Sequence, residues 1–393
     1  MKSENKHKVA MERVQTAIDE LESNDFTLYF FVVDCKNTPN GCMYYTYQLA
    51  KTLHDKGYKV VMLYQLANEY TPAEIRSANK KNQPLDPART FEGVGNWLGQ
   101  EYAELTHQNV MNEEWSIKAS DFLFIPEALS SIMLQTYKLN APCKRYVIQY
   151  NFDNVTEFIP LSVEWKHYGI YDVVTTSNKQ AELIKSVFPY VHPTVIPPCI
   201  PPMFGPTEVG KKLIVNIVAK RQSDVNKIVK QFYWKYPMYK FVSFQDLRNY
   251  SLDGLAGELQ ASPITVWADD HTPFGYTAIA AMRCGNLVIG KVPEVLPDWA
   301  VQKDGQLRNN CIWTYDVNAI PDIVAQAVSA FLQGNDDAFT SDDVATTCQE
   351  YTIEQWNDNV EMFGRNIVKE RINDLKNVHA AMKTQLESMQ VVE

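Results

Sequence analysis

A group of polar and small residues follows a short apolar run in the segment WADDHTPFGYTAIAAMRCGNLVIG (267–290). The run ITVWAD (264–269) is typical of a buried strand, and the apolar residues after it recur at helical spacing. Thr272 and Pro273 stand where a helix N-cap and a first helical residue are expected. Gly275 lacks a Cβ, so a ligand can approach the backbone closely there. Because a helix start presents unpaired N–H groups and the positive end of the helix dipole, this segment predicts an anion site.

Two basic residues, Lys220 and Arg221, follow another predicted strand, LIVNIVA (213–219). The carboxyl ends of parallel strands meet at one edge of a sheet, where open α/β sheets bind their ligands. These two cations and the amides near Gly275 would together form a cradle for a diphosphate. The plainer interpretation is that the cations are solvated surface side chains and that Gly275 merely packs against a neighbour.

Apolar runs alternate with helical patterns along the chain, which predicts doubly wound α/β lobes with parallel sheets. In the first half, strands are expected at 26–34, 58–64, 121–126, 145–150, 171–177 and 194–198, and helices at about 42–56, 127–138 and 178–188. In the second half, strands are expected at 213–219, 240–244, 264–269, 286–290 and 311–315, and helices at about 225–235, 251–260, 273–284 and 319–333. Residues 65–120 show no clear pattern and are expected to hold an insertion.

The proline-dense segment PPCIPPMFGP (197–206) separates the two alternations, because proline lacks the amide donor that a helix or a sheet needs. We therefore expect one lobe in residues 1–198 and a second in residues 199–350. Residues 351–393 are predicted to be helices that pack back along both lobes. A coiled coil that binds a partner is the alternative for this last segment.

The composition excludes several classes of protein. Hydrophobic residues make up 45% and charged residues 21% of the 393, and no apolar run approaches the roughly 18 residues of a membrane span. The net charge of −10 does not favour binding to nucleic acid through phosphates, although a local basic patch stays possible. The seven cysteines contain no Cys-x-x-Cys pair and are expected to be reduced thiols. No secretory signal pattern is present, so a cytoplasmic location is expected.

Four segments between residues 171 and 298 resemble the donor lobe of retaining GT-B glycosyltransferases: TTSNKQAELIKSVFPYVHPTVIPPCIPPMF, VNIVAKRQSDVNK, TPFGYTAIAAMRCGNLVIG and PEVL. Residues 39–63 resemble, more loosely, the glycine loop, helix and strand of the first lobe of that family. The resemblance implies two Rossmann-like lobes that face a cleft, with 1–198 on the acceptor side and 199–350 binding the donor. It implies a hexosyl- or pentosyltransferase that moves a sugar from a nucleotide-sugar to an acceptor. That acceptor can be a glycan, a small molecule, a protein or a modified DNA base.

The resemblance also implies which residues form the site. The expected donor contacts are Asn40 and Gly41 in the first lobe and Asp270, Thr272, Phe274, Gly275, Tyr276, Thr277 and Glu294 in the second. The candidate catalytic residues are Lys220 and Arg221, which would pair with the phosphates, together with Asp153 and His271. Asp153, in the loop after 145–150, would hold the acceptor or the reacting sugar.

Two glutamates of the family are replaced here, by Thr272 and Ala280. In the family, the first contacts the sugar and the second the ribose. Asp269, Asp270 or His271 are candidates for the missing sugar contact, and Glu294 could reach the cleft from the next loop. The replacements leave two alternatives open, a non-catalytic nucleotide-sugar-binding protein and a nucleotide-sugar epimerase of the same fold.

The chain contains no Asp-x-Asp triplet, the metal ligands of other sugar transferases. We therefore expect transfer without a metal and without any cofactor other than the nucleotide-sugar itself.

Overall fold

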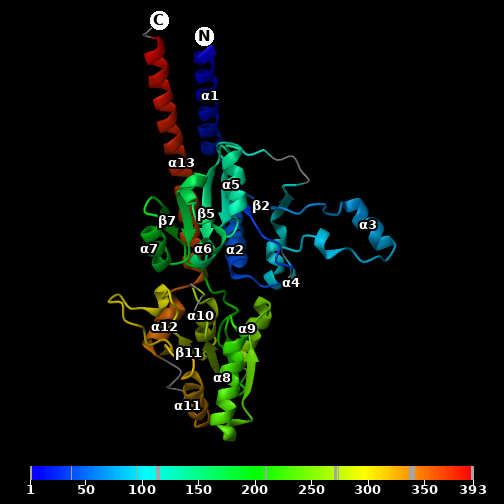
Figure 1. The fold of residues 1–393 in the computed structure, drawn as a ribbon, viewed down its shortest axis with the longest axis vertical. Helices are drawn as coiled ribbons and strands as arrows, with labels where there is room; N and C mark the ends of the chain where they lie inside the picture. The colour runs from blue at the N-terminus through cyan, green and yellow to red at the C-terminus, as the bar shows by residue number, and fades with distance from the viewer. Residues whose placement is uncertain are drawn as a thin grey trace.

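Two parallel sheets form the centres of two lobes, which lie one above the other along the long axis of the molecule (Figure 1). The computed structural model describes residues 2–36, 38–93, 95–111, 116–208, 210–269, 272, 274–335 and 341–390. The seven-stranded sheet has the order β3-β2-β1-β4-β5-β6-β7, and the five-stranded sheet has the order β12-β11-β10-β8-β9. We call the lobes around these sheets the N lobe and the C lobe. This architecture confirms the predicted α/β fold class.

The N lobe contains all but one of its strands where the apolar runs predict them. Its strands are β1 (Thr27–Phe31), β2 (Lys59–Tyr64), β3 (Thr106–Asn109), β4 (Phe122–Pro126), β5 (Lys144–Gln149), β6 (Asp172–Thr175) and β7 (His192–Val195). Its larger helices are α2 (Gly41–Asp55), α5 (Ser130–Lys138), α6 (Phe152–Phe158) and α7 (Asn178–Val187). The sequence does not predict β3, because this edge strand is the polar tetrapeptide THQN and carries no apolar pattern.

The segment between β2 and β3 projects sideways from the N lobe (Figure 1). It contains α3 (Pro72–Lys80), which has no buried residue, and α4 (Gly95–Leu98). Short 3-10 helices lie here and elsewhere in the chain, at Pro87–Arg89, Gln100–Glu104, Trp165–Tyr168, Pro237–Tyr239 and Asp298–Ala300. An insertion is expected within residues 65–120, and the projecting segment lies in that range.

The C lobe repeats the alternation of strand and helix. Its strands are β8 (Ile214–Val218), β9 (Ser243–Asp246), β10 (Ile264–Trp267), β11 (Leu287–Lys291) and β12 (Ile312–Thr314). Its helices are α8 (Gln222–Lys235), α9 (Leu252–Ala261), α10 (Tyr276–Arg283), α11 (Ile320–Leu332) and α12 (Asp342–Gln349). All strand pairs of both sheets are parallel, so the loops after neighbouring strands share one edge.

The first and last helices lie side by side and extend beyond the N lobe (Figure 1). These are α1 (Lys2–Glu22), which the sequence did not predict, and α13 (Ile353–Gln390). Between α12 and α13 the chain crosses from one lobe to the other. The Tyr351 ring packs against Phe274 of the C lobe, whereas the Trp356 ring packs against Tyr45 of the N lobe and its indole N–H donates to Thr52 at 2.7 Å. No helix in the described part of the chain combines the length and the apolar character needed to cross a bilayer.

Candidate functional site

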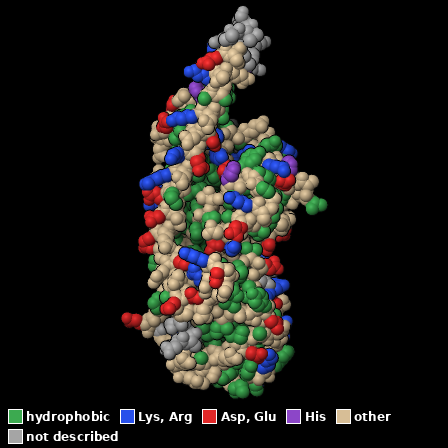
Figure 2. All heavy atoms as spheres, turned by 90° about the vertical axis from the view of Figure 1, so that its left-hand side faces the viewer, with side chains coloured by type: hydrophobic (Ala, Val, Ile, Leu, Met, Phe, Trp, Pro, Cys, Tyr) green, Lys and Arg blue, Asp and Glu red, His purple; other side chains and the backbone are tan. Residues whose placement is uncertain are grey.

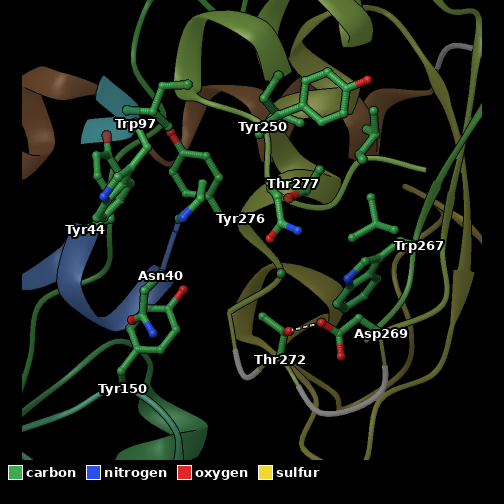
Figure 3. A pocket seen from close by; sticks show the side chains of 18 residues that line it. Asn40, Tyr44, Trp97, Tyr150, Tyr250, Trp267, Asp269, Thr272, Tyr276 and Thr277 are labelled. Atoms are coloured by element: carbon green, nitrogen blue, oxygen red, sulfur yellow. Dashed lines mark hydrogen bonds between the residues drawn. The ribbon is translucent and has the colours of Figure 1, made fainter. Parts of the chain in front are cut away.

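A cavity of about 290 Å³ lies between the two lobes (Figure 3). In the N lobe it is lined by residues that follow β1 and β5 and by Trp97, and in the C lobe by residues at or after the carboxyl ends of β8, β9 and β10. The carboxyl edges of the two sheets therefore face each other. Its aromatic walls are Tyr44, Trp97 and Tyr150 on one side and Tyr250, Trp267 and Tyr276 on the other. Polar groups among its lining include Asn40, Asp269, Thr272 and Thr277. Apolar walls with a few polar groups are typical of small-molecule sites.

The C-lobe wall is built around Gly275. Its φ angle of +70° is left-handed, and it is the N-cap of α10. A Cβ at this position would lie 2.9 Å from ring carbons of both Trp267 and Trp299, so only glycine fits between the two indoles. The Trp299 indole N–H also donates to the carbonyl oxygen of Phe274. The aromatic packing therefore fixes where the chain turns into α10.

This packing corrects the expected start of the helix. The sequence placed Thr272 at the N-cap and the helix from residue 273, but α10 begins at Tyr276. Thr272 instead donates a hydrogen bond from its hydroxyl to the Asp269 carboxylate, and both side chains line the cavity (Figure 3). The left-handed turn at Gly275 prevents helical hydrogen bonding from continuing back to Thr272.

The start of α10 lies at the cavity. Gly275, Tyr276 and Thr277 all line it, and the first N–H groups of a helix have no acceptor within the helix. Phe274 lies elsewhere than expected, because its side chain is buried in the C-lobe core against the ring of Tyr351, with the centroids 5.2 Å apart. Of the five described residues between 272 and 277 that are expected to contact the donor, the structure therefore brings four to the cavity, and Phe274 is the exception.

Lys220 and Arg221 lie at the same sheet edge as the start of α10. Val218 pairs with Trp267 in the register of β8 and β10, so the residues after these two strands are neighbours. Neither basic side chain lines the cavity, although Val218 does. Lys220 is exposed, and Arg221 is the N-cap residue of α8, where its Nε donates to Asp224 at 3.1 Å. The residues predicted to form the cradle thus lie along one sheet edge, and Lys220 and Arg221 lie outside the cavity lining.

On the N-lobe wall, Asn40 and Gly41 line the cavity, and each also makes a contact that stabilises the fold. The Asn40 side chain caps α2 by accepting a hydrogen bond from the Met43 N–H at 3.0 Å. A Cβ on Gly41 would lie 2.9 Å from the Tyr150 hydroxyl oxygen, so glycine makes room for this ring. Burial raises the pKa of Tyr150, and the charges of Cys42 and of Asp269 add to the increase. The Asp269 charge thus acts on Tyr150 from the opposite lobe.

Sequence reasoning missed Glu127, the residue that positions Tyr150. Glu127 follows β4 and is fully buried. Its carboxylate accepts hydrogen bonds from the backbone N–H groups of Tyr150 and Asn151, both at 3.1 Å, and from the Asn154 side chain at 2.8 Å. Burial raises the pKa of Glu127, although these hydrogen bonds oppose the increase. Its position directly after a buried strand is the signal that could identify it, but the sequence pattern predicts a helix that starts at about residue 127.

Four other predicted residues do not line the cavity or are not described. Asp153 is an exposed residue in the first turn of α6, and Glu294 is exposed in the loop after β11. Asp270 and His271 lie outside the described residues. Asp269, one of the alternatives for the missing sugar contact, does line the cavity.

The described residues contain one cluster that could supply three metal ligands, formed by His54, Asp55 and Glu104. Lys51 lies 2.6 Å from both of its carboxylates, so a cation is already present. None of these residues lines the cavity.

Comparison with known proteins gives no match to a family model and none to a curated protein sequence. Solved structures do match. A sucrose-phosphate synthase from Thermosynechococcus elongatus is 12% identical, with a TM-score of 0.55 over 88% of this chain and 99% of that chain. The chain has the GT-B fold.

Two further GT-B structures are similar over almost their whole length. The pneumococcal O-GlcNAc transferase GtfA, in complex with UDP and GlcNAc, is 10% identical, with a TM-score of 0.53 over 91% of this chain and 99% of that chain. The Anabaena HepE protein, in complex with UDP-glucose, is 13% identical, with a TM-score of 0.50 over 86% of this chain and 99% of that chain. At such low identity, the similarity establishes the glycosyltransferase-like fold and nothing finer.

Proposed function

We propose that this protein is a glycosyltransferase that binds a nucleotide-sugar in the cavity between its lobes. The observation that carries the proposal is the placement of the start of α10, at Gly275, Tyr276 and Thr277, opposite Asn40 and Tyr150. A helix start is suited to a diphosphate because unpaired N–H groups and the helix dipole both favour negative charge. The presence of UDP or UDP-glucose in similar GT-B structures supports this choice of ligand.

The leaving diphosphate is the group that such an enzyme must stabilise. Glycosyl transfer passes through an oxocarbenium-like state while negative charge accumulates on the departing nucleotide. The N–H groups of Tyr276 and Thr277 are preorganised at the cavity and need no reorganisation as that charge develops. Lys220 and Arg221 lie on the same edge, and their long side chains would turn toward the diphosphate once it is bound.

Asp269 is the residue best placed to contact the sugar. Its carboxylate lines the cavity and is oriented by the hydroxyl of Thr272, the residue that stands in the place of a family glutamate. A carboxylate held in this way accepts hydrogen bonds from sugar hydroxyls. The aromatic walls formed by Trp267 and Tyr150 provide apolar surface for the sugar ring or the base.

We further propose that the transfer retains the anomeric configuration and proceeds without a metal. Retention of the anomeric configuration is proposed because the sequence resembles retaining GT-B enzymes. Independence of a metal is proposed because the sequence contains no Asp-x-Asp triplet. Product stereochemistry by NMR and activity after treatment with a chelator test the two parts separately.

The test of the activity is incubation with a panel of nucleotide-sugars, with the released nucleoside diphosphate as the readout. Lys220→Ala and Arg221→Ala should each lower the rate about a hundredfold, the typical effect of removing one stabilising donor. Lys212→Ala is the matched control, because Lys212 is an exposed lysine just before β8, at the opposite end of the same strand. Unchanged rates in both cleft variants would show that the cradle is misassigned.

A non-catalytic nucleotide-sugar-binding protein is the second candidate, favoured by Thr272 and Ala280 at the positions of the two family glutamates. It predicts that a nucleoside diphosphate raises the melting temperature while no donor is consumed. An epimerase of the same fold would instead release an altered sugar without any acceptor.

A further inference from the structure

We propose that the outer end of the C lobe docks on an anionic lipid bilayer. The surface in question is the lysine-aromatic tip, which we define as residues 227–241, KIVKQFYWKYPMYKF. It comprises the second half of α8, the 3-10 helix Pro237–Tyr239 and the two residues after it. Three large apolar side chains of this tip face solvent: Trp234 is 75% exposed, Met238 65% and Phe241 60%.

None of these three side chains belongs to the hydrophobic core of the C lobe. The tip buries Phe232 completely, and the Tyr239 ring stacks on it with the centroids 6.1 Å apart. Two consecutive turns, closed by Tyr239 N–H to Tyr236 O at 3.0 Å and by Val242 N–H to Tyr239 O at 2.9 Å, hold the inward residues in place. The outward residues are therefore left on one end of the lobe, and a grouped apolar surface of this kind is typical of an interaction site.

The charge of the tip identifies the partner. Residues 227–241 contain four lysines and no acidic residue, in a protein whose net charge is −10. Lys235 pairs with Asp322 at 2.9 Å, whereas Lys230 and Lys240 are exposed and have no acidic partner among the described residues. Apolar aromatic side chains surrounded by lysines match a bilayer surface, where rings enter the headgroup region and lysines neutralise anionic lipids.

The tip lies far from the cavity. α8 begins next to Arg221 at the edge of the cleft and ends at Lys235, so its 14 residues span roughly 21 Å. Figure 1 shows α8 directed toward the end of the molecule opposite the chain termini, and Figure 2 shows hydrophobic side chains at that end. Docking through the tip would leave the cavity open above the bilayer.

The experiment is flotation of the full-length protein with vesicles of phosphatidylcholine alone or mixed with phosphatidylglycerol. The protein should float with the mixed vesicles only, and salt should weaken the binding. Lys230→Gln combined with Lys240→Gln should weaken it about twenty-five-fold, because each lysine near an anionic surface contributes roughly a factor of five. Trp234→Ser combined with Phe241→Ser should weaken it at least about tenfold, because the inserted apolar surface is lost.

Two variants serve as matched controls that should bind like the wild type. Tyr315→Ser removes a ring that is 79% exposed. Tyr315 follows β12, and β12 and β9 are the two opposite edge strands of the sheet. Lys212→Gln removes an exposed lysine outside the tip. Circular dichroism verifies that every variant is folded. Lack of flotation, or flotation that the four tip substitutions leave unchanged, would overturn the proposal. A dimer that Trp234→Ser dissociates, without vesicle binding, would overturn it too and identify the tip as a self-association surface.

Discussion

On the N-lobe wall of the cavity, Tyr150 and Asn151 are held by hydrogen bonds to one buried carboxylate, Glu127. On the C-lobe wall, Gly275 is held by the packing of Trp267 and Trp299 on either side of it. The first arrangement depends on the protonation of a side chain, whereas the second depends on the space available to a backbone. The same cavity should therefore respond to pH through one wall and to side-chain volume through the other.

The largest effect is expected from Gly275→Ala. The added Cβ meets two indole rings at 2.9 Å in a left-handed conformation, so we expect a loss of roughly 3 kcal/mol of unfolding free energy. Urea denaturation measures the loss, and stabilisation by a nucleoside diphosphate should disappear with it. Gly257→Ala is the control, because a Cβ at this position on α9 meets nothing within 4 Å and alanine favours a helix. Equal stability of the two variants would show that the tryptophans do not constrain the C-lobe wall.

A smaller effect on the unfolding free energy, limited to one pH range, is expected from Glu127→Gln. Burial raises the folded-state pKa of Glu127 above its ordinary value of 4.5, so the folded protein keeps a proton that the unfolded chain has lost. The unfolding free energy of the wild type should therefore fall as the pH rises from 4.5 through the folded-state pKa. The fall is about 1.4 kcal/mol for each unit of the increase in pKa, and it should be absent in the variant.

Urea denaturation of both proteins at a series of pH values measures this component. Glu157→Gln is the control, because Glu157 is an exposed glutamate on α6, the helix that follows the Glu127-bound loop. Parallel pH profiles of the wild type and Glu127→Gln would contradict the electrostatic account of the N-lobe wall.

The smallest effect is expected from Thr272→Val, which removes the hydrogen bond to Asp269 while keeping the shape of the side chain. The loss should be about 1 kcal/mol in the binding of a nucleotide-sugar, measured by calorimetry. Thr346→Val, on the exposed side of α12, should leave binding unchanged. A loss of roughly 3 kcal/mol or more in the binding free energy, beyond what one hydrogen bond contributes, would mean that Thr272 contacts the ligand directly.

The strands could be predicted from the sequence because each buried strand is an apolar run between turns. β10 is such a run. β3 could not be predicted in this way, because its sequence THQN is polar and contains no apolar run. The start of α10 could not be predicted correctly, since the local pattern at Thr272 resembles an N-cap and nothing nearby in the sequence identifies Trp299 as a neighbour of Gly275. Glu127 was missed because its hydrogen-bond partners lie more than 20 residues away.

The sequence by itself determined the alternation of strand and helix, the parallel sheets and the loops that carry polar residues, because these follow from periodicity and turn chemistry within short segments. Only the tertiary structure decided which of those residues meet. Gly275 and Tyr150 reach one cavity, while Phe274 is buried and Lys220 stays outside. The physical reason is that packing volume and buried charge act between residues distant in the chain, where no local pattern records them.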